Sequence, residues 1–282
     1  MTATSARPAV VPAPLERRSP LPVFTKSLTD SWRSLVGWSL GFIAALSLYL
    51  PIFPSMSGNS QMQDLIDSLP PALTRTINYE NISTGAGYAQ STFFGLMGFL
   101  LISIAAISWG AAAIGGDEES GQLELTLAHA VTRMEVAVQR FAALAVKILA
   151  LAAVAFRMVL FWNGPAELDI DAANLASTCL LFAGHALVCG STALLCGALT
   201  GRRIWGIGGG TAVAVGGYVF NAVGNQSTDL AWLHALSPYY AAYGHHPLIH
   251  GADAWTLALF YLAALVLGVL AALTLRQRDV GV

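Results

Sequence analysis

The sequence predicts an all-α membrane protein with six transmembrane helices. Of its 282 residues, 55% are hydrophobic and only 11% are charged, and the mean hydropathy is +0.61. Soluble globular chains carry about 25% charged residues. Disorder is excluded for most of the length because it requires low hydrophobicity and high net charge. A net charge of −2 excludes a strongly basic nucleic-acid binder, and an odd count of three cysteines argues against a disulfide framework.

Six apolar runs approach the roughly 20 residues that cross the hydrocarbon core of a bilayer. We expect helices, because lipid leaves unpaired backbone groups unsatisfied and none of the runs alternates like a barrel strand. The expected spans cover residues 35–53, 92–114, 136–162, 175–199, 204–223 and 254–275.

The distribution of basic residues predicts that both termini face the cytoplasm. Only Arg75 lies in a loop on the opposite side. Residues 1–30, rich in Pro, Ala and Ser, are expected to form a flexible cytoplasmic tail, and residues 31–282 the transmembrane domain. This tail is too long and too polar for the start of a signal peptide, so the first span is expected to be retained. Eleven of the 14 Lys and Arg residues lie on the expected cytoplasmic side: Arg7, Arg17, Arg18, Lys26, Arg33, Arg133, Arg140, Arg202, Arg203, Arg276 and Arg278.

Two outer loops, 55–90 and 224–253, are long enough to carry structure. In the first, apolar residues recur at helical spacing over 62–69, which predicts a short amphipathic helix that either lies on the membrane surface or gates a substrate path. The second is rich in aromatic residues and His, a composition typical of the membrane interface.

The loop 115–135 is the expected cytoplasmic segment that is long enough to dock a partner. Acidic residues at 117–119 open it, and Leu123, Leu127 and Ala130 fall at helical spacing. Acids at the start and Arg133 at the end both suit a helix dipole. The residues alone predict either a short in-plane helix or an ordinary solvated connector.

This loop resembles the signature of ABC-2 type transporter permeases, the membrane subunits of a class of ATP-driven exporters. Ala130 stands where that family often has Pro. The resemblance extends to the C-terminus through Pro247-Leu248, Gly251 and a basic end at 276–280. The matching motifs are Glu118-Glu119, Gly121, Leu123-Glu124-Leu125, Val131-Thr132-Arg133 and Leu236-Ser237-Pro238-Tyr239-Tyr240.

The resemblance implies a type V exporter-like ABC-2 permease fold in a bacterial inner (plasma) membrane. It also implies a dimer with a second copy or a sister permease, and two cytoplasmic ABC ATPase subunits. The loop would then be a coupling helix that inserts into the ATPase. The residues expected to make that contact are Glu118, Glu119, Gly121, Glu124 and Arg133.

The chain itself is not expected to be an enzyme. A P-loop needs Gly-x-x-x-x-Gly-Lys-Ser/Thr, and neither Lys26, preceded by Thr25, nor Lys147, preceded by Val146, stands in such a motif. ATP and Mg²⁺ are therefore expected on the partner ATPase, with no cofactor or metal in this chain and no nucleic-acid partner.

Charged and titratable groups inside the apolar runs are candidates for the substrate pathway. Arg157 is expected either to snorkel to the outer surface or to line a cavity, and His185 either to donate an interhelical hydrogen bond or to form a proton or substrate site. Arg140 and Lys147 are expected to snorkel or to pair with acids of the loop. Because the helices are apolar, we expect a hydrophobic or amphipathic cargo such as a drug, an antibiotic or a lipid-like molecule, as in multidrug or antibiotic efflux.

Two other classes remain as alternatives: a stand-alone secondary transporter and a membrane-embedded enzyme. No internal repeat typical of the first is visible. For the second, Leu123 stands where an intramembrane CAAX-type protease would have Arg. His246 and His250 have the spacing of a zinc pair but lack the Glu of His-Glu-x-x-His.

Overall fold

The computed structural model describes residues 21–57, 82–129 and 131–278, and these contain six helical spans long and apolar enough to cross a membrane. No β-strand occurs within these ranges. Each span encloses one of the expected runs, so the all-α fold class and the six spans are confirmed. The spans are Pro22–Ser57, Gly85–Glu119, Arg133–Asn163, Ala172–Thr200, Arg203–Gly224 and Ala254–Gln277.

The first span consists of α1 (Pro22–Tyr49), η1 (Leu50–Ile52) and α2 (Phe53–Ser57). Residues 22–30, which we expected in the flexible tail, are the first turns of α1. Pro22 suits a helix start because its missing N–H has no helical partner to lose. The Gln139 side chain then accepts hydrogen bonds from the backbone N–H groups of Val23 and Phe24, at 3.0 Å each. Residues 1–20 of the expected tail lie outside the described ranges.

The second span is α5 (Gly85–Ala89), η2 (Gln90–Met97), α6 (Gly98–Ala111), η3 (Ala112–Gly116) and α7 (Asp117–Glu119). It begins seven residues before the expected start at Thr92, because the Thr84 hydroxyl caps α5 by accepting a 3.0 Å hydrogen bond from the Gly87 N–H. The outer loop therefore ends before residue 90. Its expected amphipathic helix at 62–69 lies outside the described residues. Both η2 and η3 are π-helical.

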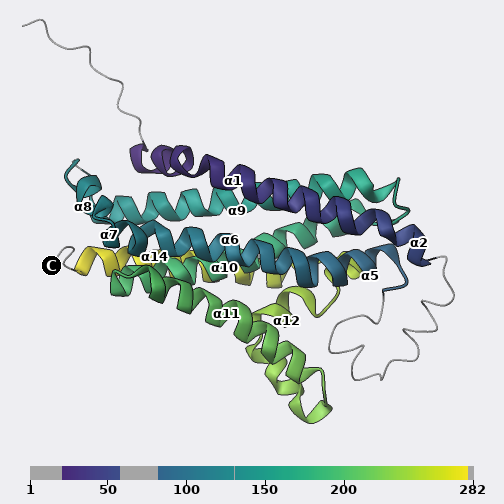
Figure 1. The fold of residues 1–282 in the computed structure, drawn as a ribbon. Coiled ribbons are helices and arrows are strands. Elements are labelled where there is room, and N and C mark those ends of the chain that lie inside the picture. Colours follow the sequence, from purple (N-terminus) through teal and green to yellow (C-terminus); the bar gives the residue numbers. More distant parts are fainter. Residues whose placement is uncertain (1–20, 58–81, 130, 279–282) are drawn as a thin grey trace, which may run out of the picture.

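The remaining long helices are α9 (Arg133–Asn163), α10 (Ala172–Thr200), α11 (Arg203–Gly224) and α14 (Ala254–Gln277). Helix α10 lies at the centre and packs against the other three and α6 (Figure 1). Its most apolar stretch is 78% buried, against 17% for the first span. Phe182 of α10 lies 5.4–6.2 Å from the rings of Phe42, Phe93 and Phe94, which joins α1 and η2 to this core.

Small residues allow α6 and α10 to approach each other closely. A Cβ atom on Gly110 would overlap the carbonyl oxygen of Gly190, and a Cβ on Gly190 would lie 3.0 Å from the carbonyl oxygen of Ala106. Such contacts are common where membrane helices pack backbone to backbone.

The bundle has two chemically different ends. The first, here called the α8 end, contains α8 (Gln122–Leu127), α7, the starts of α1, α9 and α11, and the ends of α10 and α14 (Figure 1). The opposite α12 end carries η4 (Thr228–Leu236), α12 (Pro238–Tyr243) and α13 (Pro247–His250), so the expected loop 224–253 is largely helical. Figure 1 shows α11 diverging from the bundle toward this end, where η4 and α12 pack against it.

Candidate functional site

The segment from Asp117 to Leu127 folds as two short helices joined by a tight turn. The turn depends on Gly121, whose φ of 72° lies in the left-handed region that L side chains rarely adopt. No atom lies within 4 Å of a Cβ built there, so the requirement is conformational and not steric. The expected short helix is therefore present as α8.

One face of α8 is anchored in the bundle and the other is exposed. Leu123 is fully buried in a cluster that includes Val136 of α9 and Leu275 of α14, and Leu127 packs against the same cluster. Leu125 is 60% exposed, and the neighbouring Glu124 is also exposed. Leu125 and Glu124 thus present an apolar and a charged side chain on a helix that Leu123 anchors, an arrangement that suits the docking of another protein.

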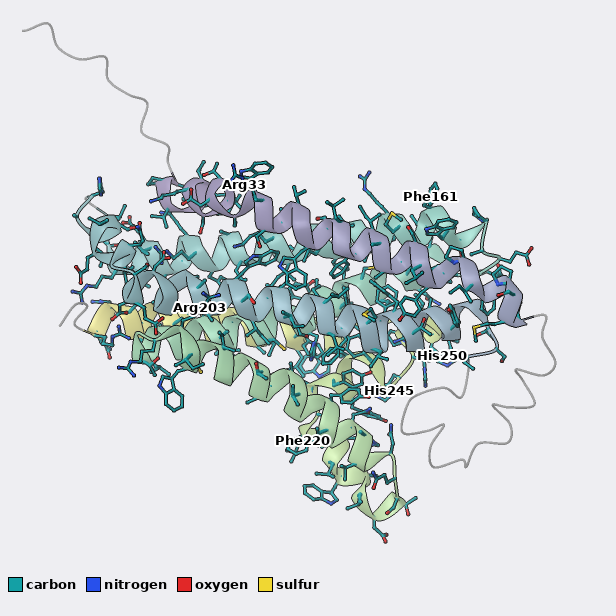
Figure 2. All side chains as sticks on the ribbon, viewed as in Figure 1. Arg33, Phe161, Arg203, Phe220, His245 and His250 are labelled. Carbon is teal, nitrogen blue, oxygen red and sulfur yellow. The ribbon has the colours of Figure 1, made fainter. Side chains whose placement is uncertain are left out.

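Two of the residues expected to contact a partner make contacts within the chain. Glu118 forms an ion pair with Arg278, and its side chain is 17% exposed. A Glu119 side-chain oxygen accepts a 3.1 Å hydrogen bond from the backbone N–H of Arg203, the first residue of α11, whose side chain is labelled in Figure 2. A negatively charged carboxylate at the start of a helix is stabilised by the positive end of the helix dipole.

Arg133 also faces inward. Its guanidinium donates to the backbone carbonyl of Arg278, and the residue begins α9. Thr132 caps that helix: its hydroxyl accepts from the Glu135 N–H at 3.2 Å, while the Glu135 carboxylate accepts from the Thr132 N–H at 2.8 Å. This reciprocal pair fixes the exit of the segment into α9.

A cleft of about 620 Å³ lies between α8 and the start of α1. Charged groups from three elements line it: Lys26 and Asp30 from α1, Asp117 from α7, and Arg140 from α9. Asp117 and Arg140 form an ion pair at 2.6 Å, which confirms the expected pairing of Arg140 with a loop acid. The apolar side chain of Leu125 also lines this cleft, next to its charged groups.

Lys147, which we expected to snorkel or to pair with a loop acid, forms no ion pair among the described residues. Its ammonium lies 4.8 Å from the ring centroid of Trp109, and the Trp109 indole donates a 3.0 Å hydrogen bond to the Ser34 hydroxyl. The aromatic face therefore replaces the carboxylate as the partner of this cation.

Sequence reasoning did not single out Leu125 and Arg278 as residues of this site, and it did not name Asp117 as the loop acid that pairs with Arg140. Leu125 was detectable, because a residue two positions from the buried Leu123 must lie on another face of a helix. Arg278 is 160 residues from its partner Glu118, and no local pattern connects them.

The two substrate-pathway candidates lie in contrasting places. Arg157 is exposed on α9, and Phe161, one turn further along, projects outward from the bundle (Figure 2). His185 is fully buried, with the rings of Phe99, Tyr243 and Phe260 at 5.5, 5.7 and 6.0 Å. The prediction that His185 donates an interhelical hydrogen bond was wrong, since neither of its ring nitrogens has a hydrogen-bond partner among the described residues. A role of either residue in transport stays a prediction.

The motif at 236–240 closes the α12 end. Ser237 caps α12 by accepting from the Tyr240 N–H at 2.9 Å, and its hydroxyl donates to the Gly217 carbonyl of α11 at 2.6 Å. The Tyr239 hydroxyl donates to the Gly95 carbonyl of η2 at 2.5 Å. Burial raises the pKa of Tyr239, which keeps this donor protonated. The motif therefore ties α11 and η2 to α12.

The six apolar helical spans define a multi-pass membrane protein. Helix α8 is a structured segment that lies outside these spans. The chain matches the model of the ABC-2 family transporter proteins over residues 21–280 and belongs to that family. It is thus an ABC transporter permease. A search of curated proteins found no match.

Proposed function

We propose that the chain is the membrane subunit of an ATP-driven exporter in a bacterial inner membrane, with both termini in the cytoplasm. Two copies, or one copy and a sister permease, would form the translocation pathway. Two ABC ATPase subunits would bind ATP and Mg²⁺ and dock on the segment 115–135. Family membership and the fold of the α8 end support this proposal.

The observation that carries the docking site is the two-faced α8. Leu123 holds the helix in the bundle, while Leu125 and Glu124 are exposed beside the charged cleft. Protein interfaces commonly have an apolar core and a polar rim, and the exposed Leu125 beside charged groups matches this composition. Among the residues expected to contact the ATPase, Glu124 is free to do so directly. Glu118, Glu119 and Arg133 would act by holding α8 in place, and Gly121 by shaping the turn.

The proposed cargo is a hydrophobic or amphipathic small molecule, such as a drug, an antibiotic or a lipid-like compound. The apolar character of the spans and the aromatic surroundings of His185 support this class. Arg157 and His185 are the residues to substitute first in transport assays.

The test is co-purification of the tagged chain from native membranes in mild detergent, with the partners identified by mass spectrometry. We expect a cytoplasmic protein with a P-loop in stoichiometric amount, and we expect L125R to lose it. The matched control is L236R, because Leu236 is 56% exposed at the opposite end. A chain that purifies alone in several detergents would contradict the proposal and favour a stand-alone transporter or a membrane enzyme.

A further inference from the structure

Arg278, the residue after α14, joins four helix ends. Its guanidinium pairs with the Glu118 carboxylate of α7 and donates a 2.6 Å hydrogen bond to the Ala198 carbonyl near the end of α10. Its own backbone carbonyl accepts from the guanidinium of Arg133 at the start of α9. The ends of α7, α9, α10 and α14 therefore meet at this one residue.

The Glu118–Arg278 ion pair occupies space that a side chain at position 201 would fill. Gly201 ends α10 with a φ of 70°, and a Cβ there would overlap both the Glu118 carboxylate and the Arg278 guanidinium. The same glycine thus supplies the left-handed turn between α10 and α11 and the room for the ion pair.

Glu118 depends on this partner. One of its carboxylate oxygens pairs with Arg278, while the other is buried without a hydrogen-bond partner among the described residues. With side-chain exposures of 17% for Glu118 and 23% for Arg278, water screens the pair only partly. Removing the guanidinium would leave a partly buried carboxylate uncompensated, which costs more than removing both groups.

Two features of the backbone flank α7. The π-helical η3 directly precedes α7, and π-helical turns are frequent at functional sites. The Gly121 turn directly follows, and its Cβ position has no neighbour within 4 Å. The position of α7 therefore depends on the contacts of its three carboxylates, among them the Glu118–Arg278 pair, and α7 leads directly into the turn before α8.

We propose that Arg278 is a positioning residue of the coupling segment. It holds α7 against the ends of α10 and α14, so that α8 is presented in one orientation, and it transmits displacement of α7 to α9 and α14. The transmission rests on the function proposed above, whereas the positioning is a property of the chain alone.

The first part of the test measures amide hydrogen exchange of residues 117–128 in the full chain in nanodiscs. We expect R278Q to raise exchange there by about tenfold, because a charge-assisted contact is lost. R278K should keep most of the protection, and R278Q/E118Q should exchange less than R278Q alone. The matched control is R276Q, which removes the same charge from an exposed residue two positions away and should exchange like wild type.

The second part measures ATP hydrolysis and transport by the complex with its co-purified ATPase. We expect R278Q to bind the ATPase but to hydrolyse ATP with several-fold less transport per ATP, and R278K to restore the ratio. Equal exchange in R278Q and R276Q, or no rescue by R278K, would overturn the positioning role. If no ATPase co-purifies with wild type, the proposed function fails, while the exchange result still decides the role of Arg278.

Discussion

At the α8 end the helices are joined by charged side chains, whereas at the α12 end they are joined by hydroxyl groups and aromatic rings. The first end holds the Asp117–Arg140 and Glu118–Arg278 ion pairs. The second holds the Tyr239 hydrogen bond to Gly95 and the stacked rings of His234 and Tyr240, with centroids 3.9 Å apart. The Glu118–Arg278 pair is partly exposed and can re-form with new partners, whereas packed aromatic rings hold one arrangement. We therefore expect movement at the α8 end and a fixed arrangement at the α12 end.

The largest expected effect is the loss of Arg140, whose side chain is 5% exposed and whose guanidinium also donates to the Ala113 carbonyl. R140A should lower the free energy of unfolding by about 2 kcal/mol, because the Ala113 carbonyl loses its donor and the partly exposed Asp117 loses its cation. Thermal unfolding in detergent measures this loss. The double variant D117A/R140A should recover part of it, and R276A should behave like wild type. If R140A unfolded like R276A, the ion pair would contribute nothing to the α8 end.

At the α12 end, Y239F should cost about 1–2 kcal/mol of unfolding free energy, because the Gly95 carbonyl would lose a buried donor. The matched control is Y240F, since the hydroxyl of Tyr240 forms no hydrogen bond among the described residues. We expect no change in amide exchange at residues 117–128 in either variant. Faster exchange at residues 117–128 in Y239F would show that the two ends are coupled and would contradict the distinction between them.

The smallest expected effect is that of G121A, which places a side chain in a left-handed turn and should cost about 1 kcal/mol. The strain should appear as faster amide exchange confined to α7 and α8. G116A serves as the control, because Gly116 has a helical φ of −69° and a Cβ there would meet only ordinary contacts of 3.5 Å or more. Identical exchange in the two variants would contradict the conformational role assigned to Gly121.

The local features of the fold were predictable from the sequence, and its long-range contacts were not. Apolar runs located all six spans, and the spacing of Leu123 and Leu127 predicted α8. The start of α1 was missed, although Pro22 is a start signal, because apolarity alone was used to place that span. The fold puts Glu118 beside Arg278 and Asp117 beside Arg140 through helix packing, which no short motif encodes.

This difference changes the interpretation of the acidic loop. A cluster of acids at 117–119 indicates a surface for a basic partner, yet each carboxylate finds a partner inside the chain. The proposed docking surface instead includes the exposed Leu125 and Glu124, five to eight residues beyond the paired acids of α7. The charge pattern therefore drew attention to this segment but did not show which of its acids are paired within the chain, and contact with an ATPase stays a prediction.

The central claim is that the exposed face of α8 touches the ATPase, and site-specific photocrosslinking tests it most directly. A photoreactive amino acid would replace Leu125 in the full chain, and irradiation would be carried out in native membranes. We predict a crosslink to a cytoplasmic protein that carries a P-loop, and none to that protein from the same group at Leu236. A crosslink from position 236 and none from position 125, or no P-loop protein at either, would contradict the account.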